Sequence, residues 1–238
     1  MKRVCVYCAS SQGCAPDYHE AAHQLGEVLA CHGYTIVYGG GAVGSMGALA
    51  NGALGMGGEV IGGIPHFMVE LEWAHEGVTC SERVDDMRIR KHKMLDGSCA
   101  TIALPGGSGT LEELFEVLTL KRLGIYRNPI VLVNTRGYFD ELTRFLNHCI
   151  DERFMNPQHA KMWSVVPGPE EVVEVLTSGP DWPENAYTQW LQEQGTSWEE
   201  LYSGPSTNYK KHGVPEEYHQ TTWCAEKAIE FIREQTGP

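Results

Sequence analysis

Short runs of apolar residues alternate along this chain with longer segments in which apolar residues recur at every third or fourth position. Such short runs are typical of strands buried in a parallel sheet, whereas the three-four spacing predicts amphipathic helices. The predicted strands cover residues 4–8, 35–38, 59–64, 101–104 and 130–134, with a further candidate at 163–166. The predicted helices cover residues 18–32, 48–56, 86–95, 111–123 and 138–152.

This alternation predicts an α/β fold, in which βα units build a doubly wound parallel sheet with helices on both faces. Ligands of such sheets bind beyond the carboxyl ends of the strands. The loops that follow the predicted strands are therefore the first places to look for a site.

The pattern changes after Thr177. The segment 179–183 reads Gly-Pro-Asp-Trp-Pro, and four of the six tryptophans lie beyond its start. We therefore predict one domain over residues 1–178 and a C-terminal arm over 179–238, with an amphipathic helix at 216–235. Such an arm could pack on its own domain, pack on a second subunit, or cover the site as a lid.

The formal net charge of -13 disfavours binding to nucleic-acid backbones or to anionic membranes, so any phosphate should belong to a small ligand. No stretch approaches the roughly 18 consecutive apolar residues of a spanning helix. The chain starts directly in a strand-like pattern rather than a signal peptide. A cytoplasmic location is the resulting expectation.

Eight cysteines are scattered over the chain, which favours reduced thiols over a disulfide framework. Cys5 and Cys8 form a C-x-x-C pair, but they lie within an apolar run, and no second pair completes a zinc site. We expect no metal.

A first glycine-rich loop follows the predicted strand 35–38 and opens a helix. Glycines without side chains let backbone N–H groups approach an anion, which the helix N-terminus also attracts. The same glycines could instead serve close packing or a tight turn, and the full dinucleotide fingerprint is missing. The candidate substrate contacts of this loop are Gly40, Gly41, Gly44 and Met46.

A second loop, Pro-Gly-Gly-Ser-Gly-Thr-Leu-Glu-Glu at 105–113, follows the strand 101–104. The helix after it has apolar residues at 111, 114, 115 and 118, which predicts one buried face. Thr110 and Glu113 have the spacing of a capping box, yet capping leaves the three glycines unexplained. Neither loop carries the lysine of a P-loop, which argues against hydrolysis of nucleoside triphosphates.

The segment 86–94 is basic and predicted helical, and it places Arg90 and Lys91 on the same face as Met87 and Met94. A cation on such a face needs an anionic or hydrogen-bonding partner. Both side chains could alternatively extend to solvent or pair with nearby acids, namely Glu82, Asp85 and Asp86.

These three features together resemble the LONELY GUY family of cytokinin riboside 5′-monophosphate phosphoribohydrolases, a family also described as lysine decarboxylases. The resemblance runs over residues 4–176 and rests on three motifs in the same order. They are Gly-Gly-Gly-x-x-Gly-x-Met-Gly at 39–47, the pair Arg90-Lys91, and Pro-Gly-Gly-x-Gly-Thr-x-x-Glu at 105–113.

The resemblance implies a Rossmann-like fold, a homodimer, no cofactor, and Arg90 with Glu113 as the catalytic pair. It also implies a set of substrate-binding residues, namely Glu72, Lys91, Gly107, Ser108, Gly109, Thr110, Leu111, Glu112 and Thr119.

The implied reaction is hydrolysis of the N-glycosidic bond of an adenine-type nucleoside 5′-monophosphate, either a cytokinin riboside 5′-monophosphate or AMP. By analogy with glycosidases, Glu113 would bind the ribose hydroxyls and stabilise positive charge at C1′ or orient water. A pyridoxal-phosphate decarboxylase is disfavoured, since Lys91 and Lys93 lie on a basic helix without an evident pocket. A non-catalytic nucleotide-binding protein using the same loops remains the alternative.

Overall fold

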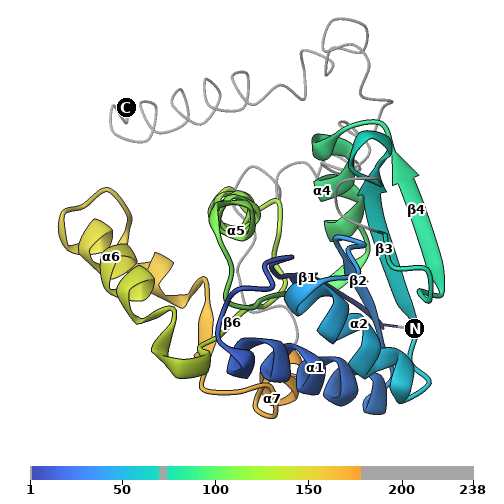
Figure 1. The fold of residues 1–238 in the computed structure, drawn as a ribbon. Helices are drawn as coiled ribbons and strands as arrows, with labels where there is room; N and C mark the ends of the chain where they lie inside the picture. Colours follow the sequence, from blue (N-terminus) through green and yellow to red (C-terminus); the bar gives the residue numbers. More distant parts are fainter. Residues whose placement is uncertain (1, 70–73, 178–238) are drawn as a thin grey trace, which may run out of the picture. The chain divides into compact units, whose positions relative to one another are not determined.

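The computed structural model describes residues 2–69 and 74–177 (Figure 1). Seven parallel strands form one sheet in the order β4-β3-β2-β1-β5-β6-β7. The strands are β1 (Lys2–Tyr7), β2 (Tyr34–Tyr38), β3 (Val60–Pro65), β4 (Cys80–Val84), β5 (Ser98–Ala103), β6 (Ile130–Val133) and β7 (Ser164–Val166).

The described α-helices are α1 (Pro16–Cys31), α2 (Gly44–Gly55), α4 (Met87–Leu95), α5 (Ser108–Arg122), α6 (Asp140–Asp151) and α7 (Val172–Thr177). Three short 3-10 turns accompany them, namely η1 (His66–Met68), η2 (Thr135–Gly137) and η3 (Pro157–Lys161).

The sheet separates two hydrophobic cores. Along β1, Val4 and Val6 point into one core while Cys5 and Tyr7 point into the other, as the two-residue period of a strand requires. Helices α1, α2 and α7 cover the first face, and α4, α5 and α6 cover the second (Figure 1). The predicted doubly wound α/β fold is confirmed.

Helices α1 and α2 pack closely because glycines occupy their contact. A Cβ on Gly26 would stand 2.2 Å from the carbonyl oxygen of Leu49, and a Cβ on Gly52 would stand 2.1 Å from that of His23. Only glycines, which lack a side chain, allow the backbones of α1 and α2 to approach so closely. This contact fixes α2, and therefore the loop that precedes it, against the sheet.

Two elements escaped sequence analysis. β4 lies at the sheet edge with mostly exposed residues, so it lacks the apolar run that marked the buried strands. α7 is too short to show a helical period, although Val172 and Leu176 are buried.

Helices α2 and α5 also begin earlier than predicted, at Gly44 and Ser108, because glycines in their first turns suggested loop. These starts bring both glycine-rich segments into the first helical turns.

The contacts within the chain define two units, residues 1–122 with 126–182, and residues 123–125 with 183–238. The predicted arm at 179–238 and its helix at 216–235 lie outside the described residues. Within residues 2–69 and 74–177, no helix combines the length and the hydropathy needed to cross a membrane.

The contact between α1 and α2 predicts opposite effects of two Gly→Ala substitutions. Gly26→Ala should lower the free energy of unfolding by about 1–3 kcal/mol, because its methyl group meets backbone atoms that cannot move aside. Gly55→Ala, in a helix end with nothing within 4 Å of the new atom, should leave stability unchanged or raise it by up to about 1 kcal/mol. Urea denaturation measures both, and equal effects would contradict the proposed packing.

Candidate active site

The candidate site lies where the strand order reverses, beside the central strand β1. Its neighbours β2 and β5 lead into the two glycine-rich loops. Backbone hydrogen bonds join Leu104 N to Tyr7 O and Met46 N to Ala9 O, at 2.9 and 3.1 Å, so the segments after β1, β2 and β5 converge. Such a switch point is where doubly wound sheets form ligand sites.

Arg90 is buried within this region. Asp86 caps α4 by accepting a hydrogen bond from Ile89 N at 2.8 Å, so the helix starts at Met87, three residues before the arginine. The guanidinium donates from Nε to Gly63 O at 2.9 Å and from Nη2 to Gly39 O at 3.3 Å. A Cβ on Gly39 would stand 2.1 Å from Nη2, so a side chain at position 39 would displace the guanidinium from this place.

Glu113 is the acidic neighbour of this buried arginine. Its Oε1 lies 3.6 Å from Arg90 Nη1, and the two side chains are only 7% and 4% exposed. At this length the contact is an ion pair rather than a hydrogen bond. Since an uncompensated buried charge is costly, each group stabilises the other in the interior. The structure thus brings together the two residues predicted to be catalytic.

The capping-box interpretation of Thr110 and Glu113 is wrong. Because α5 begins at Ser108, Thr110 lies inside the helix rather than at its cap. Glu113 belongs to the buried stripe of α5, together with Leu114 and Val117. Phe115, which we expected on the buried face, is 40% exposed.

Lys91 forms ion pairs with α5 rather than with the acids near its own helix. Its Nζ lies 2.5 Å from Glu112 Oε1 and 3.0 Å from Glu116 Oε2. Burial alone would lower the pKa of Lys91, but the hydrogen bonds to the two carboxylates outweigh it and raise the pKa. The expected pairing with Glu82 belongs instead to Lys93, at 3.5 Å.

The second glycine-rich loop has one packed and one open part. A Cβ on Gly106 would meet the side chain of Thr110 at 2.2 Å, so this residue is held tightly. Gly107, Ser108 and Gly109 are exposed, and added Cβ atoms on the two glycines would meet nothing within 4 Å. Backbone N–H groups at the start of α5 can therefore be reached by a ligand.

The glycines of the first loop are mostly explained by packing. Gly40 has φ +81° and lies against Gly62 and Ile64, while Gly44 has φ +61° and lies against the backbone of Ser10. Gly41 is buried and accepts a hydrogen bond from Tyr38 Oη at 3.1 Å. The alternative of close packing and tight turning therefore accounts for these residues.

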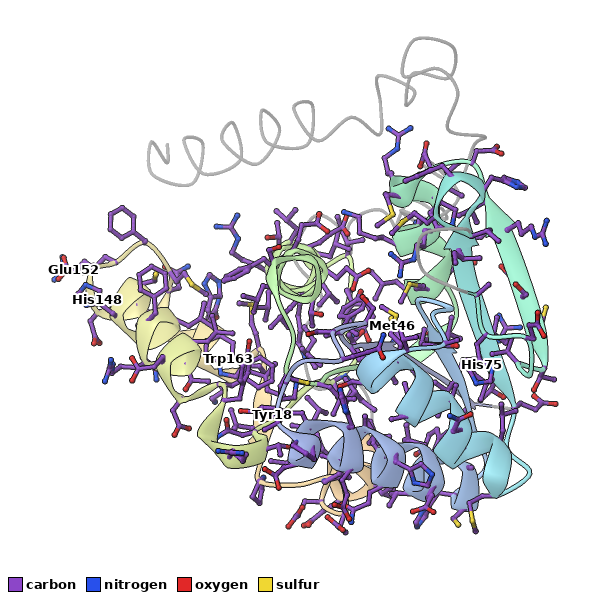
Figure 2. The ribbon with its side chains drawn as sticks, in the orientation of Figure 1. Tyr18, Met46, His75, His148, Glu152 and Trp163 are labelled. Carbon is purple, nitrogen blue, oxygen red and sulfur yellow. The ribbon has the colours of Figure 1, made fainter. Side chains whose placement is uncertain are left out.

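Met46 lies at the first turn of α2 (Figure 2) and is buried. A Cβ on Gly39 would stand 3.0 Å from its methyl group and 2.1 Å from Arg90 Nη2, so both side chains border the same glycine. Met46 is thus close to the candidate catalytic arginine.

Two further predicted contacts on α5, Thr119 and Leu111, have their partners away from the arginine. Thr119 is exposed and donates to Phe115 O at 2.8 Å, within its own helix. Leu111 is half-buried against the core below α5. Glu72 lies outside the described residues, but Ala74 after it pairs with Gly41 in an isolated antiparallel bridge.

Sequence analysis missed Tyr7, the last residue of β1. It is fully buried, and its hydroxyl has no hydrogen-bond partner in the described part of the chain. Burial raises the pKa of Tyr7, and the neighbouring Cys5 side chain and Glu113 carboxylate raise it further, so the phenol stays protonated. The signal in the sequence that could have pointed to Tyr7 was its position at the end of a predicted strand, next to the segments that the two glycine-rich loops approach.

Within residues 2–69 and 74–177, no group of three or more His, Cys, Asp or Glu side chains is placed to hold a metal ion.

Residues 46–176 match the family model described as possible lysine decarboxylase. The chain is 42% identical over 175 residues to the Arabidopsis thaliana cytokinin riboside 5′-monophosphate phosphoribohydrolase LOG7, covering 74% of this chain and 81% of that protein. It is 41% identical to the probable phosphoribohydrolase LOGL6 of Oryza sativa, covering 74% and 70%.

Among solved structures, the molybdenum cofactor binding protein of Rippkaea orientalis superposes with a TM-score of 0.58 at 23% identity. The match covers 75% of this chain and 97% of that one. This likeness shows a shared Rossmann-like fold and nothing beyond it.

The buried ion pair predicts unequal roles for two adjacent cations of α4. Arg90→Met should lower the free energy of unfolding by about 3 kcal/mol, because Glu113 stays buried without its guanidinium. Lys91→Met should cost about 1 kcal/mol or less, since Glu112 and Glu116 are more accessible to water. Guanidinium chloride titrations of both variants make the comparison. A smaller loss for Arg90→Met than for Lys91→Met would refute the assignment.

Proposed function

The chain belongs to the possible lysine decarboxylase family, which includes the LOG cytokinin riboside 5′-monophosphate phosphoribohydrolases, and from that premise we propose its reaction. It hydrolyses the N-glycosidic bond of an adenine-type nucleoside 5′-monophosphate and releases free base and ribose 5-phosphate. The observation that carries the proposal is the buried pair of Arg90 and Glu113 next to the open loop 107–109.

Glu113 stabilises the sugar as the bond to the base breaks. Cleavage proceeds through an oxocarbenium-like ribose, and a carboxylate fixed beside C1′ lowers the energy of that cation. A carboxylate held inside the protein interacts more strongly with such a charge than one surrounded by water. The buried position of Glu113 on α5 supports this role.

Arg90 stabilises negative charge on the departing base. A guanidinium remains protonated throughout the physiological range, so it acts as a hydrogen-bond donor and a fixed positive charge rather than as a proton source. Its anchoring by Gly63 O and Gly39 O limits its movement, which preorganises the charge before the substrate arrives.

The 5′-phosphate binds at the start of α5, on backbone N–H groups of residues 107–109 and with Thr110 nearby. The exposed backbone and the positive end of the helix dipole support this placement. Leu111, Glu112 and Lys91 complete the wall of the site. The first loop forms the bottom of the proposed site through Gly40, Gly41 and Gly44, and its Met46 borders Arg90.

A decarboxylase reaction has less support. Lys91 and Lys93 are engaged in ion pairs with acidic residues, and the buried Lys121 donates to Asn128 O at 3.0 Å. A Schiff base between pyridoxal phosphate and any of these three amines would require that amine to leave its partner. A non-catalytic nucleotide carrier would use the open loop but would not need the buried charge pair.

We also propose a homodimer in the cytoplasm. Phe115 and Thr119 lie exposed on α5, on the side away from the core, where a second subunit could cover them. Such a contact would bring Thr119 to a substrate site, which agrees with the substrate-binding role that the family resemblance implies for it. Glu72 is likewise proposed as a substrate contact on the resemblance alone.

The proposed phosphate site predicts a strong preference for monophosphates. AMP or an N6-modified relative should release its base at least about 100-fold faster, by kcat/KM, than the matching nucleoside, since phosphate binding orients the ribose. Chromatography of free base from a panel of nucleosides, monophosphates and triphosphates provides the measurement. Comparable rates with and without phosphate would exclude a phosphate-binding role for the loop.

The proposed role of Glu113 predicts the effect of making it neutral. Glu113→Gln should lower kcat by roughly two to three orders of magnitude. It should also lower the free energy of unfolding by about 1–3 kcal/mol, because Arg90 loses its charged partner. Glu116→Gln, one turn along the same helix, serves as the matched control and should keep its rate.

Base release is assayed at a temperature where melting curves show both variants folded. A folded Glu113→Gln protein that keeps more than about a third of the rate would falsify the catalytic assignment, since a lost contact of only about 1.4 kcal/mol costs tenfold.

A further inference from the structure

Tyr138 connects the loop after β6 to the proposed phosphate loop. It follows the turn η2, and its hydroxyl donates a hydrogen bond to Gly106 O at 2.6 Å. Sequence analysis did not single it out, because it reads as one aromatic residue at the start of a helix. Its bond partner lies in the loop that follows the neighbouring strand β5.

The tyrosine ring is fixed from two sides. It packs edge-on against Tyr18, which Figure 2 labels on α1, with 5.7 Å between ring centroids, and against Phe139 at 5.2 Å. Arg136 reaches across to α1, where its Nη1 lies 2.6 Å from Asp17 Oδ2. These contacts hold the hydroxyl in place although the residue is 40% exposed.

The partner carbonyl is also fixed. Gly106 is buried, and a Cβ there would stand 2.2 Å from Thr110 Oγ1, so the backbone of Gly106 packs directly against the first turn of α5. A phenol has one hydroxyl proton, and Tyr138 donates that proton in its hydrogen bond to Gly106 O. The hydroxyl therefore has none left to donate to a bound anion.

The orientation of this carbonyl sets the orientation of the next N–H group. All described peptide bonds are trans, and in a trans peptide the C=O and the following N–H point in opposite directions. With Gly106 O turned toward Tyr138, Gly107 N–H points the other way. Gly107 is exposed, and no group in residues 2–69 and 74–177 accepts its N–H.

We propose that Tyr138 is a positioning residue that orients the Gly106–Gly107 peptide so that Gly107 N–H donates to the phosphate of the substrate. The inference rests on the proposed function, since it assumes that phosphate binds at this loop. Without the hydroxyl, the Gly106–Gly107 peptide would have to reorient when the substrate binds. The affinity for the bound substrate and the affinity for the transition state would then weaken by the same amount.

The test compares Tyr138→Phe with a matched control, Tyr18→Phe, which removes a hydroxyl from the neighbouring ring but leaves Gly106 O bonded. For AMP, Tyr138→Phe should raise KM about fivefold to tenfold and leave kcat within about twofold. For adenosine, which lacks the phosphate, kcat/KM should stay within about twofold. Calorimetry should show a matching loss of affinity for ribose 5-phosphate, and Tyr18→Phe should leave all four values unchanged.

The outcomes separate the inference from the proposed function. Wild-type protein that prefers AMP over adenosine, with a Tyr138→Phe variant that has the same KM and the same affinity for ribose 5-phosphate, overturns the inference alone. Equal losses on AMP and adenosine overturn it too, because they indicate a general structural role. Wild-type protein that neither discriminates between the two nor binds ribose 5-phosphate overturns the proposed function and the inference with it.

Discussion

The arrangement of this site depends on keeping the charges of Arg90 and Glu113 inside the protein. Removing two such groups from water costs several kcal/mol each, and their attraction offsets this only with further hydrogen bonds. The carbonyl oxygens of Gly63 and Gly39 supply those bonds, and the missing side chain of Gly39 leaves the space. The pair links α4 to α5 and thereby joins the glycine loop after β2 to the one after β5.

This constraint gives the glycines of the two loops different roles. In the loop after β2 they allow close backbone contacts and positive φ angles, which bring the backbone up to the arginine. In the loop after β5, Gly107 and Gly109 border open space and leave N–H groups accessible. A packed side holds the charges and an accessible side is open to a ligand, an arrangement that would suit a reaction whose catalysis depends on preorganised electrostatics.

Residues outside the charge pair keep its surroundings in place. Tyr138 holds Gly106 O from the next loop, and Lys91 bridges Glu112 and Glu116 across the same two helices as the central pair. Tyr7 brings a buried, protonated phenol to the end of the central strand. None of these contacts involves residues that are close in sequence, so the site depends on the whole sheet to assemble it.

The doubly wound fold can be predicted from the sequence alone, because buried parallel strands and amphipathic helices have apolar patterns of different period. The sequence also predicted which motifs carry the chemistry, through their resemblance to a known family. Three features emerge only in the folded chain: Arg90 pairs with Glu113, α5 begins at Ser108, and β4 forms an exposed edge. The physical reason is that periodicity reports which face of an element is buried. Which buried groups meet depends on how the helices pack across the sheet.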